Sequence, residues 1–196
     1  GLSPVVDVHQ RAQLERADLL IAVGLDLVEL RPHWLPGWPE SLPVLSIDPH
    51  GQPDLLGTLC GELLGSVVAS LALIRPRLSR SAWSPAELQA HRTAIEEPFD
   101  DGPDGPAETI RAVQRACPDD VLLTLDVGAH RITACHVWRC ARPRRQLQSN
   151  GFSSMATGLP MAIAARLHAP ETPVVCITGD MGLQMALGEL GICLDR

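Results

Sequence analysis

V-V-C-I-T-G-D-M-G-L-Q-M-A-L-G-E-L, residues 174–190, is the stretch that decides the fold of this chain. Residues 174–178 are apolar, rich in β-branched side chains and bounded by proline and glycine, which predicts a short strand covered on both faces. Apolar residues then recur at helical spacing over residues 181–190. Asp180 is therefore expected just past the carboxyl end of a strand, at the start of a helix.

The turn G-D-M-G, residues 179–182, combines a carboxylate with the free backbone N–H groups of a helix start. That combination suits a divalent cation bound to a diphosphate, because the N–H groups attract the anion and the carboxylate binds the metal. Taken alone, Asp180 also fits a plain N-cap of the following helix.

A second motif precedes this one, S-N-G-F-S-S-M-A-T-G-L-P-M-A at residues 149–162. The two motifs, at this separation, resemble the cofactor domain of thiamine-diphosphate-dependent enzymes of the acetolactate synthase type. In that family the later motif closes with an asparagine, and this chain ends at Arg196 before it. Because the sequence also begins without methionine, we interpret it as part of a longer protein.

The resemblance implies roles for individual residues of both motifs. Asp180 would ligate Mg²⁺, and the backbone N–H groups of Met181 and Gly182 would contact the cofactor diphosphate. Met155 would be the apolar wedge that bends the cofactor into its reactive shape, although unbranched methionines also serve as ordinary core filler. Ser153 would offer its backbone carbonyl to the 4′-amino group of the cofactor.

A third segment, D-V-G-A-H at residues 126–130, follows an apolar strand expected at residues 121–125. It resembles the D-x-G-x-H segment of the same family, which implies that Gly128 and His130 belong to the cofactor site, with His130 at the diphosphate. A lone histidine at a strand end also fits a structural role. Since open α/β sheets bind ligands at the carboxyl ends of their strands, both turns are expected to face one crevice.

Two apolar runs earlier in the chain, residues 19–24 and 44–47, predict parallel strands and resemble the central domain of that family. Some members bind FAD there, but this chain has no G-x-G-x-x-G and does not favour it. Trp34 and Trp38 would either stack on a ligand or cover a core edge. Residues 55–73 are expected to form a helix that closes this domain.

The predicted fold is α/β, a parallel-sheet, Rossmann-like remnant of the central domain followed by a truncated thiamine-diphosphate-binding domain. The expected limits are residues 1–77 for the first part and 106–196 for the second, which opens with a helix at 106–117. Residues 78–105 are rich in Ser, Pro, Gly and acidic side chains, which predicts a linker whose carboxylates are solvated.

Composition narrows the classes of partner. The net charge of −7 over 196 residues offers no basic face for nucleic acid. No run of 18 apolar residues and no signal peptide is visible, so we expect a cytoplasmic protein without a membrane partner. The six cysteines show no C-x-x-C spacing, which favours reduced thiols over a zinc site.

The resemblance implies a thiamine-diphosphate- and Mg²⁺-dependent enzyme, a homodimer or homotetramer, that decarboxylates a 2-oxo acid and releases an aldehyde or joins the product to an acceptor. The family's activating glutamate lies in a pyrimidine-binding domain, so the chain by itself is expected to be inactive. Two alternatives stay open: one subunit of a split decarboxylase, and a non-catalytic nucleotide-binding or scaffolding protein. The sequence does not name the 2-oxo acid.

Overall fold

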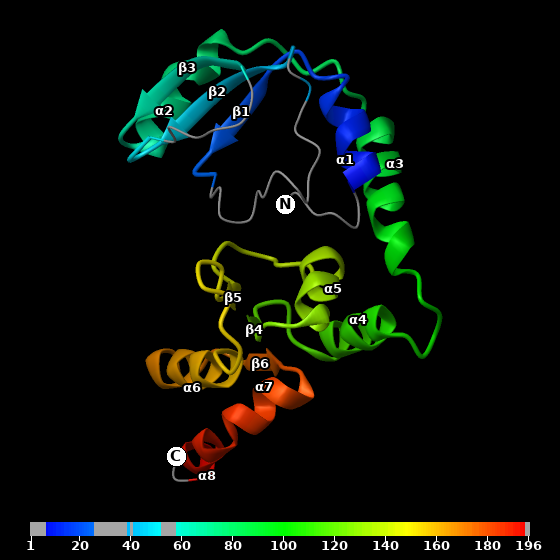
Figure 1. The fold of residues 1–196 in the computed structure, drawn as a ribbon, viewed down its shortest axis with the longest axis vertical. Helices are drawn as coiled ribbons and strands as arrows, with labels where there is room; N and C mark the ends of the chain where they lie inside the picture. The colour runs from blue at the N-terminus through cyan, green and yellow to red at the C-terminus, as the bar shows by residue number, and fades with distance from the viewer. Residues whose placement is uncertain (1–6, 26–38, 40, 52–57, 195–196) are drawn as a thin grey trace. The chain divides into compact units, whose positions relative to one another are not determined.

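The computed structural model describes residues 7–25, 39, 41–51 and 58–194, which form two compact units, residues 1–95 and 96–196. Each unit contains a three-stranded parallel sheet (Figure 1), so the predicted α/β class is confirmed. The strands are β1 (Leu20–Val23), β2 (Pro43–Asp48), β3 (Thr58–Leu64), β4 (Leu122–Leu125), β5 (Gln146–Gln148) and β6 (Val174–Ile177).

Eight α-helices and three short 3₁₀ helices lie among the described residues. The α-helices are α1 (Asp7–Leu14), α2 (Val67–Ile74), α3 (Pro85–Glu96), α4 (Pro106–Ala116), α5 (Ala129–Val137), α6 (Gly158–His168), α7 (Asp180–Met185) and α8 (Leu190–Leu194). The 3₁₀ helices are η3 (Arg75–Arg77), η4 (Glu97–Phe99) and η5 (Leu187–Glu189). Among these described helices, none is long and apolar enough to cross a membrane.

In the first unit the sheet has the order β1-β2-β3, and the two strands expected near residues 19–24 and 44–47 are confirmed as β1 and β2. β2 is the central strand, and Val44 and Ile47 are fully buried on it. Trp34 and Trp38 lie outside the described residues.

The single helix expected over residues 55–73 is wrong, because the described part of this stretch forms β3 and then α2. β3 pairs with β2 along its length, so tertiary pairing overrides the apolar composition that suggested a helix. Gly65 adopts a positive φ of 107° between the two elements, and Ser66 caps α2 by accepting a hydrogen bond from the Ala69 N–H at 3.3 Å. In the sequence, the pair Gly65-Ser66 marks the boundary between the strand and the helix.

The expected linker, residues 78–105, contains the twelve-residue helix α3. Ser84 and Glu87 form a capping box at its start: the Ser84 N–H donates to Glu87 Oε2 at 2.9 Å, and the Glu87 N–H donates to Ser84 Oγ at 3.2 Å. Pro85 occupies the first helical position, where proline is favoured. The limits of the domains stay a prediction.

The pKa of the Glu87 carboxyl provides a test of this capping box. The backbone N–H of Ser84 and the guanidinium of Arg16, 2.7 Å away, lower the pKa of Glu87 from 4.5 to about 2. The contribution of Glu87 to stability is therefore complete above pH 4.5 and is lost as the pH falls toward 2.

NMR titration of the Glu87 carboxyl should give a midpoint near pH 2. Arg16→Gln should return the midpoint only part of the way to 4.5, because the Ser84 N–H still donates. Arg80→Gln, at an exposed position elsewhere in the unit, should leave it unchanged. A wild-type midpoint at its ordinary value would rule out the capping box.

In the second unit the sheet has the order β5-β4-β6, and the strands expected at residues 121–125 and 174–178 and the helix at 106–117 are confirmed. β4 is the central strand and all four of its residues are buried. α6 packs against β4 and β6, and α4 packs against α5.

Two details expected for the second unit are wrong. The strand that is buried on both faces is β4, whereas β6 lies at the edge of the described sheet and is half-buried along its whole length. The helix expected over residues 181–190 is interrupted at Ala186, where α7 gives way to η5 and then to α8. Its apolar side chains Leu183, Leu187 and Leu190 are exposed.

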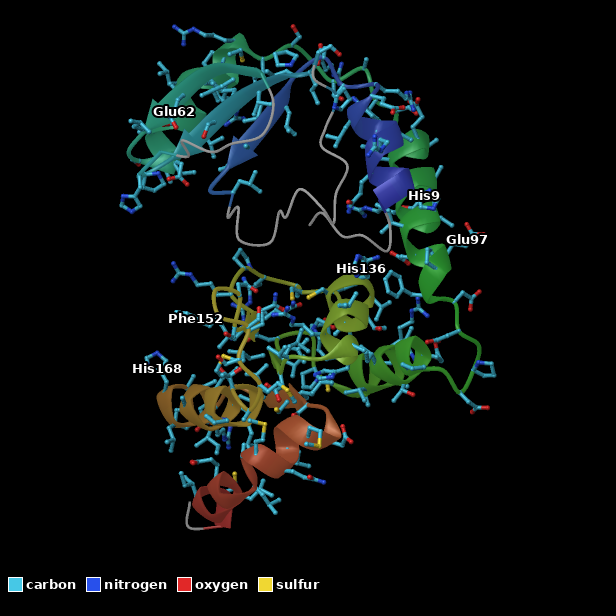
Figure 2. All side chains as sticks on the ribbon, viewed as in Figure 1. His9, Glu62, Glu97, His136, Phe152 and His168 are labelled. Atoms are coloured by element: carbon cyan, nitrogen blue, oxygen red, sulfur yellow. The ribbon has the colours of Figure 1, made fainter. Side chains whose placement is uncertain are left out.

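Parts of the acidic stretch before α4 are structural rather than solvated. Phe99 is buried and stacks on His136 of α5 with ring centroids 4.5 Å apart. His136 is labelled in Figure 2. Asp101 Oδ2 accepts a hydrogen bond from the Ala107 N–H at 2.9 Å, which satisfies one free donor of the first turn of α4.

The six cysteines form no disulfide bond with one another.

Candidate cofactor site

Three loops leave the second sheet at one edge. Leu125, the last residue of β4, pairs with Gln148 of β5 and with Ile177 of β6, so the three strands end at the same level. Since all three strands are parallel, the segments that follow them meet at the carboxyl edge, where open α/β sheets place their ligands. These segments carry all the residues that the sequence assigned to a cofactor site.

Asp126, directly after β4, joins these segments. It is fully buried, and its two carboxylate oxygens accept hydrogen bonds from two separate parts of the chain. Oδ1 accepts from the Thr157 N–H at 3.1 Å and the Gly158 N–H at 3.4 Å. Oδ2 accepts from the Ala156 N–H at 3.1 Å and the Thr178 hydroxyl at 3.0 Å. One carboxylate thus links the loop before α6 to the end of β6.

Two motif glycines make room for this carboxylate. A Cβ at Gly158 would lie 2.8 Å from the Asp126 Cβ and 2.9 Å from its backbone nitrogen. A Cβ at Gly182, on α7, would overlap Asp126 Oδ2. Both glycines are buried against Asp126, so a side chain at Gly158 would clash with its backbone and one at Gly182 would clash with its carboxylate.

The carboxyl of Asp126 is ionised at neutral pH. Burial raises its pKa, but hydrogen bonds from backbone N–H groups, including those of Ala156 and Gly158, and from the Thr178 hydroxyl outweigh burial and hold the pKa below its ordinary value. The stability that these bonds provide is complete at neutral pH and is lost only as the pH falls through that lowered pKa.

The loop between β5 and α6 carries Ser153 and Met155. Ser153 has a φ of 49° and Ala156 a φ of 66°, so Met155 lies between two non-glycine residues in the left-handed region. The Met155 side chain is partly exposed, at 41%. Arg131 of α5 anchors the start of the loop by donating to the Ser149 carbonyl at 2.7 Å. Phe152 projects from it, almost fully exposed (Figure 2).

Asp180, Met181 and Gly182 form the first turn of α7. Gly179 is the N-cap residue and Asp180 is already helical, so the alternative interpretation of Asp180 as the N-cap is wrong. The Asp180 side chain is exposed, and it accepts no hydrogen bond and forms no ion pair within the described part of the chain. Its carboxylate is therefore available to a ligand.

His130 lies between the two turns. A Cβ at Gly128, after β4, would lie 2.7 Å from the ring Cε1 of His130, and a Cβ at Gly179, after β6, would lie 3.4 Å from the same atom. Its Nε2 is buried and has no hydrogen-bond partner among the described residues. Because a buried polar atom without a partner is costly, this nitrogen fits a site that is completed by a bound polar group.

Among the described residues, this edge of the sheet offers a metal ion one available carboxylate, that of Asp180, and not a complete set of protein ligands. Across residues 7–25, 39, 41–51 and 58–194, no group of three or more His, Cys, Asp or Glu side chains could hold a metal ion. Asp126 is not available, since its oxygens already accept four hydrogen bonds. One exposed carboxylate still fits Mg²⁺, which usually keeps several waters and takes one or two carboxylates together with phosphate oxygens.

Comparison with known proteins agrees with this geometry. Residues 126–196, which contain all three loops, match the family described as thiamine pyrophosphate enzyme, C-terminal TPP binding domain. The chain is similar to thiamine-diphosphate-dependent enzymes of the acetolactate synthase type. The resemblance stated from the sequence is thereby confirmed.

Acetolactate synthases match both units. Acetolactate synthase isozyme 3 large subunit of Escherichia coli (strain K12) is 37% identical over 90 residues, 46% of this chain and 16% of the relative. Acetolactate synthase of Bacillus subtilis (strain 168) is 27% identical over 193 residues, 90% of this chain and 33% of the relative. Isozyme 2 large subunit of Escherichia coli (strain K12) is 29% identical over 192 residues, 91% and 33% respectively. This acetolactate synthase-like chain thus spans a third or less of the length of these relatives.

Sequence reasoning missed Asp126 and Thr178 as residues of the site. It singled out the segment D-V-G-A-H but assigned only Gly128 and His130 from it. A signal was present, because Asp126 follows an apolar strand in the same way as Asp180 does. The difference between the two carboxylates, one saturated with hydrogen bonds and one exposed, is visible only in the structure.

Proposed function

We propose that this chain supplies the diphosphate and metal end of a thiamine diphosphate–Mg²⁺ site in an enzyme of the acetolactate synthase type. Such an enzyme would decarboxylate a 2-oxo acid and either release an aldehyde or join the product to an acceptor. The observation that best supports the proposal is the meeting of three motif-bearing loops around Asp126 at the carboxyl edge of one sheet.

The metal and diphosphate would bind at the turn after β6. Asp180 offers an exposed carboxylate to Mg²⁺, and the backbone N–H groups of Met181 and Gly182 would donate to the diphosphate. His130 would donate a hydrogen bond from its buried, unpartnered Nε2 to a phosphate oxygen. Gly128, which has no side chain, makes room for the His130 ring, because a Cβ there would lie 2.7 Å from the ring Cε1.

The loop before α6 would hold the other end of the cofactor. Ser153 would accept a hydrogen bond from the 4′-amino group with its backbone carbonyl, and Met155 would pack its thioether between the two rings. When bound, thiamine diphosphate supplies an electron sink for the bond broken in decarboxylation. This chain would contribute binding and orientation, and a homo-oligomer would supply the activating glutamate from a pyrimidine-binding domain.

Calorimetric titration of the chain with thiamine diphosphate tests the proposal directly. We expect binding in the presence of Mg²⁺ and a loss of affinity of about tenfold or more with EDTA, a loss of about 1.4 kcal/mol in binding free energy or more. Thiamine, which lacks the diphosphate, is the matched control ligand and should bind weakly whether or not Mg²⁺ is present.

Equal affinity for thiamine and thiamine diphosphate, or indifference to EDTA, would contradict the assignment of the diphosphate and metal end. Tight binding of nucleoside diphosphates in preference to thiamine diphosphate would instead support the non-catalytic nucleotide-binding alternative.

A further inference from the structure

We propose that Asp126 is a positioning residue of the cofactor site: its carboxylate keeps the loop with Ser153 and Met155 at a fixed spacing from the turn with Asp180. The inference rests on the proposed function, because it concerns the distance between the two ends of the bound cofactor. Asp126 itself would touch neither the metal nor the cofactor.

The division of its hydrogen bonds supports this role. Oδ1 accepts hydrogen bonds only from the loop before α6, from the N–H groups of Thr157 and Gly158. Oδ2 is shared, because it accepts from the Ala156 N–H of the loop and from the Thr178 hydroxyl at the end of β6. Thr178 lies two positions before Asp180 in the sequence. A single atom therefore connects the segments that carry the two proposed contacts.

The strained backbone of the loop needs this connection. Ser153 and Ala156 both have positive φ values, 49° and 66°, which non-glycine residues rarely adopt unless the surroundings hold them there. The Ala156 N–H, at the second of these residues, donates to Asp126. Releasing that bond would free the backbone next to Met155 and with it the position of the proposed wedge.

Asp126 can act only through other residues. It is fully buried and its oxygens are occupied by four donors, so it has no access to a ligand. Gly182 lies so close to Oδ2 that the carboxylate also contacts the backbone of α7. The same side chain thus hydrogen-bonds to the loop before α6 and to the end of β6, and only contacts the first turn of α7.

Asp126→Asn provides the main test, because an amide matches the carboxylate in shape but replaces one acceptor by a donor. Affinities for thiamine diphosphate with Mg²⁺ would be measured well below the unfolding temperature, together with hydrogen exchange of each backbone amide. We expect a loss of affinity of roughly 10- to 100-fold, as for partners one step removed from a metal site. Exchange should accelerate at the amides of residues 156–158 while those of β4 stay protected.

The variants Thr178→Val and Thr178→Ser test the same hydrogen-bond network if Asp126→Asn folds poorly. Valine removes only the hydroxyl that bonds to Oδ2, and serine retains it. We expect weaker binding for valine and near wild-type binding for serine. Asp119→Asn, an exposed aspartate before β4, controls for the loss of one negative charge and should bind normally.

Inorganic diphosphate with Mg²⁺ distinguishes a loss of positioning from a loss of the whole site, because this ligand would contact only the turn with Asp180. In Asp126→Asn, the affinity for inorganic diphosphate should fall far less than the affinity for thiamine diphosphate. An equal loss for both ligands, or thiamine diphosphate affinity within about twofold of wild type, would overturn the proposal. If the wild-type chain itself binds neither ligand, the proposed function fails, and accelerated exchange at residues 156–158 still decides whether Asp126 holds the loop.

Discussion

Gly182→Ala is expected to destabilise the second unit by about 2–6 kcal/mol, from overpacking together with the loss of one buried hydrogen bond. The added Cβ would overlap Asp126 Oδ2 and lie 3.0 Å from Thr178 Oγ1. Overpacking alone costs about 1–3 kcal/mol. Displacement of the carboxylate would also leave buried N–H groups without an acceptor, at about 1–3 kcal/mol each. Because the overlap involves a residue held by four hydrogen bonds, it cannot be relieved by rotating a flexible side chain.

Urea unfolding followed by tryptophan fluorescence measures this effect. Trp138 is buried and is the only tryptophan after residue 96, so its emission reports on the second unit. Gly191→Ala on α8 is the matched control, since a Cβ there meets no heavy atom within 4 Å. That control should be neutral or more stable by up to about 1 kcal/mol, because alanine favours helix. Equal stabilities for the two variants would refute the packing of Gly182 against Asp126.

Asp180→Ala is expected to leave the fold intact and to weaken Mg²⁺-dependent binding of thiamine diphosphate by roughly 100-fold or more. Loss of a partner one step removed from a metal already costs roughly 10- to 100-fold, and a direct ligand should cost at least as much. The fold should persist because Asp180 is exposed and has no polar partner among the described residues. Loss of its favourable charge at the helix start costs only about 0.3–1 kcal/mol.

Calorimetry with thiamine diphosphate and Mg²⁺ compares Asp180→Ala with Glu189→Ala. Glu189 is an exposed carboxylate a few residues further on, so its removal changes the net charge equally. We expect Glu189→Ala to bind like the wild type. If both variants lose affinity to the same degree, long-range charge rather than metal ligation explains the effect. Unchanged affinity in Asp180→Ala would remove Asp180 from the metal site.

The elements predicted correctly from the sequence are those with a strong local signal. β1, β2, β4, β6 and α4 are short apolar runs or periodic segments bounded by proline, glycine or aspartate. The errors arose where composition misled. β3 is a strand because it pairs with β2, where the apolar composition had suggested a helix. α3 lies inside the expected linker and begins at a capping box.

The sequence by itself determined the parallel α/β class, the family resemblance and the positions of the three motifs. These follow from signals within a few residues of one another, such as the G-D-M-G turn after an apolar strand. It also placed the candidate residues Met155, His130 and Asp180 at strand ends, which parallel pairing then brings to one edge.

Only the tertiary structure decided that Asp126 binds the motifs together and that Asp180 is left free. The partners of Asp126 lie 30 residues away at Ala156 and 52 residues away at Thr178. No local pattern relates positions so far apart, because their contact exists only once β5 and β6 flank β4. Two aspartates with the same local setting thus differ in accessibility, because one is enclosed by donors from distant segments and the other faces solvent.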